Sequence, residues 1–125
     1  MRELVIRKCN KCKAMVKVIE DCNCSCGIVC CNEEMKVLKA NSTDAAFEKH
    51  VPTYKIKDDE IIVEVNHVME EDHYIEWISA VSEKEESTKY LKPGMKAKAI
   101  FKYVPGMKLY SYCNKHSLWE IEVSE

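Results

Sequence analysis

The sequence lacks three features that would place the protein in other classes. It has no surplus of basic residues, because 19 Lys and Arg are balanced by 21 Asp and Glu, for a net charge of -2. Proteins that bind nucleic acid need such a surplus to neutralise phosphates, so this class is excluded. No apolar run is long enough to span a membrane, and the N-terminus lacks the apolar core and cleavage site of a secretory leader. The sequence therefore predicts a cytoplasmic protein with no membrane partner.

Cysteine, by contrast, is abundant and unevenly placed. Seven of the eight cysteines fall between Cys9 and Cys31, and the eighth is Cys113. In a reducing cytoplasm, clustered thiols more often bind metal than form disulfides. Residues 1–37 hold too few apolar side chains to bury a core unaided, so a bound metal is expected to stabilise them.

Two cysteine pairs form the first candidate metal site. Cys9 and Cys12 have C-x-x-C spacing, whereas Cys30 and Cys31 are adjacent. Four thiolates make a tetrahedral site that suits zinc and iron equally. Adjacent cysteines are unusual for structural zinc and predict a somewhat distorted tetrahedron. The spacing does not exclude three further candidates, namely Cys22, Cys24 and Cys26.

From Val51 onward the pattern is typical of β-strands. Apolar, β-branched and aromatic residues predict strands over 60–66, 74–82, 95–103 and 118–124, with turn signals between them. Short strands at this spacing predict an antiparallel sandwich. Over 95–103 strict alternation places these side chains on one face: Met95, Ala97, Ala99, Phe101 and Tyr103, with Lys96, Lys98 and Lys102 mostly on the other.

All four histidines fall at predicted strand ends or in loops. They are His50, His67, His73 and His116, and Cys113 precedes the last by three residues. Imidazoles combined with a thiolate favour iron or copper over magnesium or calcium. A blue-copper site is the rival interpretation, but no methionine follows His116 and two histidines would have no role.

Three segments resemble the superoxide reductases of the two-iron desulfoferrodoxin type: EKHVP (48–52), NHVMEEDHYIEWI (66–78) and CNKHSLWE (113–120). The segments KCNKC and VCCNEEMKVL resemble that family's desulforedoxin-like module. The resemblance implies a rubredoxin-like iron module with four cysteine ligands over residues 1–37. It further implies a neelaredoxin-like catalytic domain over residues 38–125, with an immunoglobulin-like antiparallel β-sandwich fold, and a homodimer.

The resemblance also implies roles for individual residues. Glu48 would ligate the ferric iron in its open position, and Lys49 would attract the anion. Three departures from the family are noted. Lys13 and Val68 stand where glycine and proline are common, and the segment EDCNCSC (20–26) is longer and richer in thiols than usual. The catalytic iron would be held by His50, His67, His73, His116 and the axial thiolate of Cys113. The second iron, for which zinc is the alternative, would be held by Cys9, Cys12, Cys30 and Cys31.

The activity that the resemblance implies is one-electron reduction of superoxide to hydrogen peroxide, with a rubredoxin-like electron donor. Two other interpretations stay open: an iron protein for electron transfer or metal storage without oxygen chemistry, and a structural zinc protein. From Ser87 to Trp119 the chain has seven lysines and no acidic residue, which favours an anionic substrate. Alternating lysines are also expected on the solvated face of an edge strand, so steering depends chiefly on Lys49.

Overall fold

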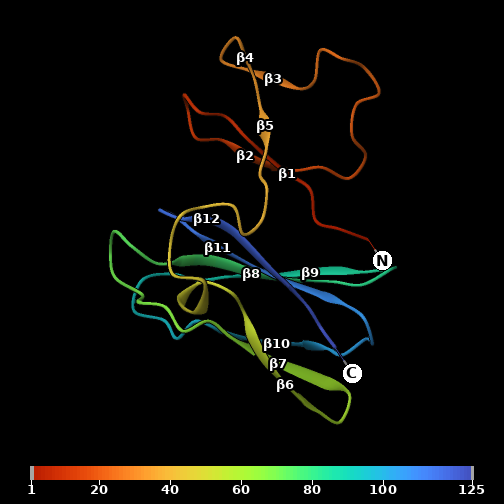
Figure 1. Ribbon diagram of the computed structural model, residues 1–125, viewed down its shortest axis with the longest axis vertical. Coiled ribbons are helices and arrows are strands. Elements are labelled where there is room, and N and C mark those ends of the chain that lie inside the picture. Colours follow the sequence, from red (N-terminus) through yellow and green to blue (C-terminus); the bar gives the residue numbers. More distant parts are fainter. Residues whose placement is uncertain (1, 125) are drawn as a thin grey trace. The chain divides into compact units, whose positions relative to one another are not determined.

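The computed structural model describes residues 2–124, which form two compact units. The first comprises residues 3–39, and the second comprises residues 40–124 together with Arg2. Within the described residues the only helix is the 3-10 helix η1 (Phe47–Lys49), and all other regular structure is β (Figure 1). No helix in residues 2–124 is long and apolar enough to cross a membrane.

The N-terminal unit is built from short antiparallel strands. One sheet has the order β2-β1-β5, and β3 pairs with β4 in a separate hairpin. Buried apolar side chains in this unit are few, chiefly Leu4, Ile6 and Met35. A core of this size contributes little stability, as the sequence predicts. The strands are β1 (Ile6–Lys8), β2 (Met15–Lys17), β3 (Val29–Cys30), β4 (Glu33–Glu34) and β5 (Lys36–Val37).

The C-terminal unit is a sandwich of two antiparallel sheets, seen nearly edge-on in Figure 1. The three-stranded sheet has the order β10-β7-β6, and the four-stranded sheet the order β12-β11-β8-β9. Buried side chains from both sheets form one core cluster, and Cys113 belongs to it. The predicted mainly β fold is confirmed. The strands are β6 (Thr53–Lys57), β7 (Glu60–Glu64), β8 (Ile75–Val81), β9 (Glu86–Tyr90), β10 (Lys98–Lys102), β11 (Lys108–Cys113) and β12 (Ser117–Glu122).

The predicted alternation over 95–103 is correct in its centre and wrong at Met95. Ala97 and Ala99 are buried, whereas Lys96 and Lys102 are exposed. Met95 is 40% exposed because the chain turns there, with the Met95 N–H donating to the Lys92 carbonyl at 3.1 Å. Strand β10 therefore begins only at Lys98.

Candidate metal centres

Five predicted ligands from separate parts of the chain meet at one end of the sandwich. One ligand atom from each side chain can be chosen so that all lie within 4.8 Å of one another. His50 follows η1, two histidines lie in the loop between β7 and β8, and the last two ligands lie at the β11–β12 turn. We call this set the histidine–cysteine site: His50, His67, His73, Cys113 and His116.

The register of β11 places the Cys113 thiol inside the sandwich. Leu109, Ser111 and Cys113 alternate with Tyr110 and Tyr112, so they share the face that packs on the other sheet. Cys113 ends the strand with 0% of its surface exposed. The register against β8 shifts between Tyr112 and Cys113, an irregularity common beside functional sites. The Cys113 thiol therefore lies on the buried side of the histidine–cysteine site.

Hydrogen bonds determine which ring nitrogen His50 and His67 offer. The Nδ1–H of His50 donates to the Ala46 carbonyl at 2.7 Å, and that of His67 donates to the Val68 carbonyl. Both rings thereby leave Nε2 for a metal, an arrangement typical of ligating histidines. His116 instead points Nδ1 into the site. The Nε2 atom of His73 is buried without a hydrogen-bond partner among the described residues.

The spacing of these atoms fits a metal ion. His50 Nε2 lies 3.0 Å from His116 Nδ1, and Cys113 Sγ lies 3.4 Å from His67 Nε2. Two nitrogens bound at about 2.1 Å and at right angles lie roughly 3.0 Å apart. A bound ion would also give His73 Nε2 the partner that it lacks among the described residues. Four imidazoles and one thiolate suit iron far better than magnesium or calcium.

Three residues that the sequence analysis did not single out hold the ligands in place. The Ser111 hydroxyl donates to the His50 carbonyl at 2.6 Å. The Asn114 side chain binds the backbone of Asp72 and Tyr74, both at 3.0 Å, which links the two ligand loops. The Trp119 indole N–H donates to the His116 carbonyl at 3.0 Å, and its ring stacks on that of His50. Such outer partners orient the ligands of a metal.

Burial also prepares the ligands for a cation. Desolvation lowers the pKa of His50 and His67, which keeps both imidazoles in the neutral form that binds metal. Desolvation raises the pKa of Cys113 and opposes its ionisation in the metal-free protein. A bound cation reverses the latter effect, because it stabilises the thiolate directly.

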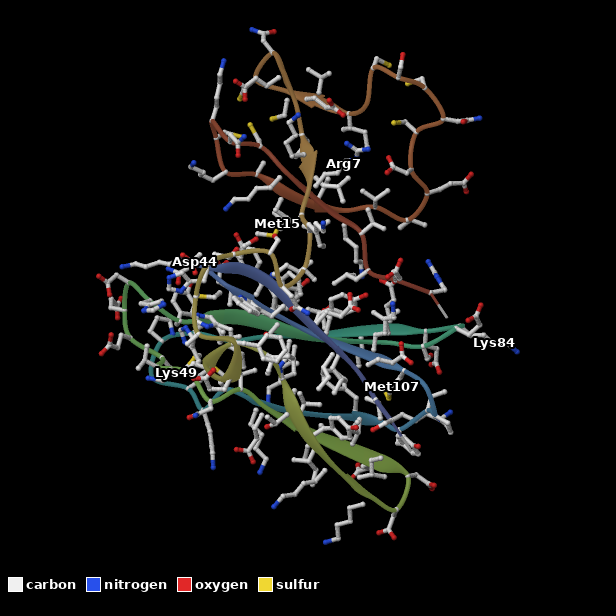
Figure 2. The ribbon with its side chains drawn as sticks, in the orientation of Figure 1. Arg7, Met15, Asp44, Lys49, Lys84 and Met107 are labelled. Atoms are coloured by element: carbon white, nitrogen blue, oxygen red, sulfur yellow. The ribbon has the colours of Figure 1, made fainter. Side chains whose placement is uncertain are left out.

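The predicted residues Glu48 and Lys49 lie on η1, immediately before His50. Both are exposed, and the Glu48 carboxylate is not among the clustered ligand atoms. Figure 2 labels Lys49 on this short helix, from which its side chain extends outward. The roles predicted for these two residues therefore remain predictions.

The four predicted N-terminal ligands also come together, within the first unit. Cys12 Sγ lies 3.6 Å from Cys30 Sγ, which in turn lies 3.8 Å from Cys31 Sγ. Two sulfurs bound at about 2.3 Å in a tetrahedral site lie roughly 3.8 Å apart. The Cys12 backbone N–H lowers the pKa of the Cys9 thiol to about 6, so one thiolate forms readily. We call this set, formed by Cys9, Cys12, Cys30 and Cys31, the tetrathiolate site.

A tight turn explains how adjacent cysteines reach one ion. Strands β3 and β4 are joined by a two-residue loop, Cys31–Asn32, with φ of 54° and 62°. Positive φ at both central residues is typical of a type I′ hairpin turn. Cys30 ends one strand and Cys31 begins the turn, so their side chains leave the backbone in different directions. Their sulfurs still lie at the spacing of metal ligands.

Lys13, which follows the C-x-x-C pair, has φ of 69°. This left-handed conformation is costly for a residue with a side chain. Lys13→Gly should raise the free energy of unfolding of the N-terminal unit by about 1 kcal/mol. Thermal unfolding of the metal-loaded protein checks this, with Lys11→Gly as the control because Lys11 has no positive φ. A lower melting temperature for Lys13→Gly than for wild type would contradict the explanation.

Comparison with known proteins agrees with this arrangement of ligands. Residues 42–122, which include all five ligands of the histidine–cysteine site, match the family described as desulfoferrodoxin. The chain belongs to the desulfoferrodoxin family. The desulfoferrodoxin of Syntrophotalea carbinolica is 39% identical over 125 residues, covering 96% of this chain and 97% of that protein. Since this similarity includes the N-terminal unit, the chain has the two modules and the two ligand sets of the two-iron type.

Solved structures support the fold. The crystal structure of the superoxide reductase from Treponema pallidum matches with a TM-score of 0.71 at 24% identity, covering 96% of this chain and 99% of that one. The 1Fe superoxide reductase from Giardia intestinalis matches with a TM-score of 0.55 at 25% identity. This match covers 62% of the present chain and 99% of the Giardia chain.

Proposed function

We propose that this member of the desulfoferrodoxin family is a superoxide reductase, an oxidoreductase that reduces superoxide to hydrogen peroxide. The observation that carries the proposal is the histidine–cysteine site, in which four imidazoles and a buried thiol converge on one point. Residues 38–125 form the catalytic domain, and residues 1–37 form an accessory iron module around the tetrathiolate site. The Giardia intestinalis protein of similar fold is described as a superoxide reductase, which supports the same activity here.

The reaction adds one electron and two protons to superoxide and yields hydrogen peroxide. Iron, when bound, supplies the electron by passing from the ferrous to the ferric state. The chain supplies the donors that favour this step. The Cys113 thiolate would hold the iron from the buried side and donate electron density to it, and the four imidazoles would supply its nitrogen ligands. This arrangement needs no large cavity, because the substrate is diatomic.

The residues of η1 are suited to act beside the histidine–cysteine site, because η1 ends directly before His50. Lys49 is an exposed cation next to a metal ligand, so it can attract superoxide by its charge. Glu48 is an exposed carboxylate at the same place, and we propose that it would be a ligand of the iron in its ferric state. Both assignments follow from the family resemblance and from position in the chain.

The reaction of the reduced protein with superoxide tests the proposal. The protein is purified without oxygen, its iron and zinc are measured, and the fully reduced form is mixed with superoxide. A reductase should show rapid oxidation of the iron in the histidine–cysteine site, first order in superoxide. A structural zinc protein would contain no such iron. An electron-transfer protein would contain the iron but react slowly.

Lys49→Ala should slow the second-order reaction with superoxide about tenfold and flatten its dependence on ionic strength. The physical reason is the loss of an exposed cation next to the ligand His50. Lys57→Ala is the matched control. Lys57 ends β6, about 13 Å along the strand from Thr53, so its charge lies roughly a Debye length or more from that end of the strand. Equal rates in Lys49→Ala and wild type would remove the steering role.

Glu48→Ala should change the absorption spectrum of the ferric protein without loss of iron. A carboxylate ligand is removed only from the oxidised state, so the ferrous spectrum should stay the same. Glu60→Ala, which removes an exposed carboxylate at the start of β7, serves as the control. An unchanged ferric spectrum in Glu48→Ala would show that this carboxylate does not bind the iron.

The partners of the reaction are proposed from the family resemblance. We propose that the protein acts in the cytoplasm as a homodimer and receives electrons from a rubredoxin-like donor. The tetrathiolate site holds iron or zinc, and metal analysis of the purified protein distinguishes the two. Sedimentation of the metal-loaded protein tests the dimer.

A further inference from the structure

Three cysteines belong to neither metal site. Cys22, Cys24 and Cys26 form a C-x-C-x-C segment in the long connection between β2 and β3. All three are free thiols; Cys24 and Cys26 are exposed and Cys22 is half-buried. Since the tetrathiolate site has its full set of four ligands without them, their function needs another explanation.

The structure holds this segment at both ends. At its start, the buried guanidinium of Arg7 donates to both carboxylate oxygens of Asp21 at 3.1 Å, and Asp21 accepts from the Cys22 N–H at 2.8 Å. At its end, the Met35 N–H donates to the Ile28 carbonyl at 2.7 Å. Gly27, with φ of 70°, lies so close to the Glu34 side chain that a Cβ would clash with it. The thiols are therefore presented on a fixed loop.

The sulfur atoms of Cys24 and Cys26 lie 2.7 Å apart, brought together by the turn at Ser25–Cys26. This distance is well below the 3.6 and 3.8 Å between sulfurs of the tetrathiolate site. A tetrahedral metal needs its sulfurs roughly 3.8 Å apart, whereas a disulfide bond is about 2.05 Å long. The pair is thus closer to the geometry of a disulfide than to that of a metal site.

The surroundings of the pair assign a different role to each thiol. The pKa of Cys24 is lowered, chiefly by a hydrogen bond from the Cys26 thiol and to a smaller extent by the backbone N–H groups of Cys26 and Gly27. Burial has the opposite effect on Cys22, whose pKa is raised. An exposed thiol that is stabilised as thiolate is the one that reacts with oxidants. Cys24 is therefore the attacking thiol, and Cys26 is placed to resolve the product.

We propose that Cys24 and Cys26 form a redox-active dithiol that reduces hydrogen peroxide and closes to an intramolecular disulfide. The Cys24 thiolate attacks one peroxide oxygen, the O–O bond breaks, and Cys24 becomes a sulfenic acid while the departing hydroxide takes a proton to form water. The Cys26 sulfur then attacks Cys24 Sγ and releases a second water. Two thiols thus give two electrons to one peroxide, and a dithiol reductant restores them. The reaction does not depend on the proposed superoxide reductase activity.

The test treats the full-length, metal-loaded protein with one equivalent of hydrogen peroxide, blocks the remaining thiols by alkylation, and locates disulfides by peptide mass spectrometry. A parallel sample is loaded with zinc, which has no redox chemistry of its own. We expect a Cys24–Cys26 disulfide in both samples, reversed by dithiothreitol. Cys22→Ser should form it at a rate within about twofold of wild type, and Cys24→Ser should lose thiols about tenfold more slowly. Cys26→Ser should retain a sulfenic acid at Cys24 that dimedone traps.

Three results would overturn the proposal. The first is a disulfide that joins Cys22 to another cysteine in wild type. The second is an unaltered rate of thiol loss in Cys24→Ser at unchanged metal content. The third is a third equivalent of metal in the wild-type protein that Cys24→Ser removes, since this would make the segment a metal site.

Discussion

With zinc in the tetrathiolate site, Cys113→Ser is expected to abolish the thiolate-to-iron charge-transfer absorption of the histidine–cysteine site and to lower the rate constant with superoxide by about 100-fold or more. The reason lies in the position of the sulfur, which is fully buried and 3.4 Å from His67 Nε2. A serine hydroxyl in the same place remains neutral, so it cannot replace a thiolate as an electron donor. Absorption spectroscopy of the ferric protein and stopped-flow mixing with superoxide provide the two measurements.

The control for this variant is Cys22→Ser, which removes a thiol outside both metal sites. It should leave the charge-transfer band, the iron content and the superoxide rate as in wild type. If Cys113→Ser kept the band, the sulfur bound to iron would have to come from another cysteine. In that case the histidine–cysteine site as described would be wrong.

Cys12→Ser is expected to release the metal of the tetrathiolate site and to unfold residues 3–39. The unit has few buried apolar side chains, so its stability depends on the metal, and structural metal sites of this type contribute about 10 kcal/mol or more. The sandwich has its own core and its own ligands, and its iron should remain. Metal analysis should therefore show the loss of one equivalent, and limited proteolysis should cleave only the N-terminal unit.

Lys11→Ser, one residue away on the same exposed turn, is the control for Cys12→Ser. It should keep both metals and resist proteolysis as wild type does. Retention of both metals in Cys12→Ser would instead show that one of the remaining cysteines replaces Cys12 as a ligand.

The ligands of both metal sites could be predicted from the sequence because the chemistry of their side chains is distinctive. The sequence has four histidines, each at a strand end or in a loop, and one isolated cysteine. Few functions other than metal binding would use all five of these side chains. The family resemblance then grouped them. What the sequence could not provide was the choice of ring nitrogen, which depends on carbonyls such as those of Ala46 and Val68. These contacts exist only once the loops are folded.

Other features were hidden for identifiable reasons. Strands β6 and β9 were not predicted because they are mostly polar edge strands, and β11 because Tyr and Ser obscure a strand that is almost wholly buried. The adjacent cysteines predicted a distorted site; the turn at Cys31–Asn32 shows how two adjacent sulfurs can lie 3.8 Å apart, and the distortion itself stays a prediction. The supporting residue Trp119 did have a signal, since it lies three residues after His116 in the segment that carries the resemblance.

The ratio of products tests the central claim most directly. The reduced Cys24→Ser protein, which lacks the peroxide-reducing dithiol proposed above, is supplied with excess reductant and exposed to a measured amount of superoxide, and both hydrogen peroxide and dioxygen are quantified. A superoxide reductase predicts one hydrogen peroxide for each superoxide consumed and no dioxygen. Equal amounts of peroxide and dioxygen, with two superoxide consumed per pair, would mean dismutation and would contradict the proposed function.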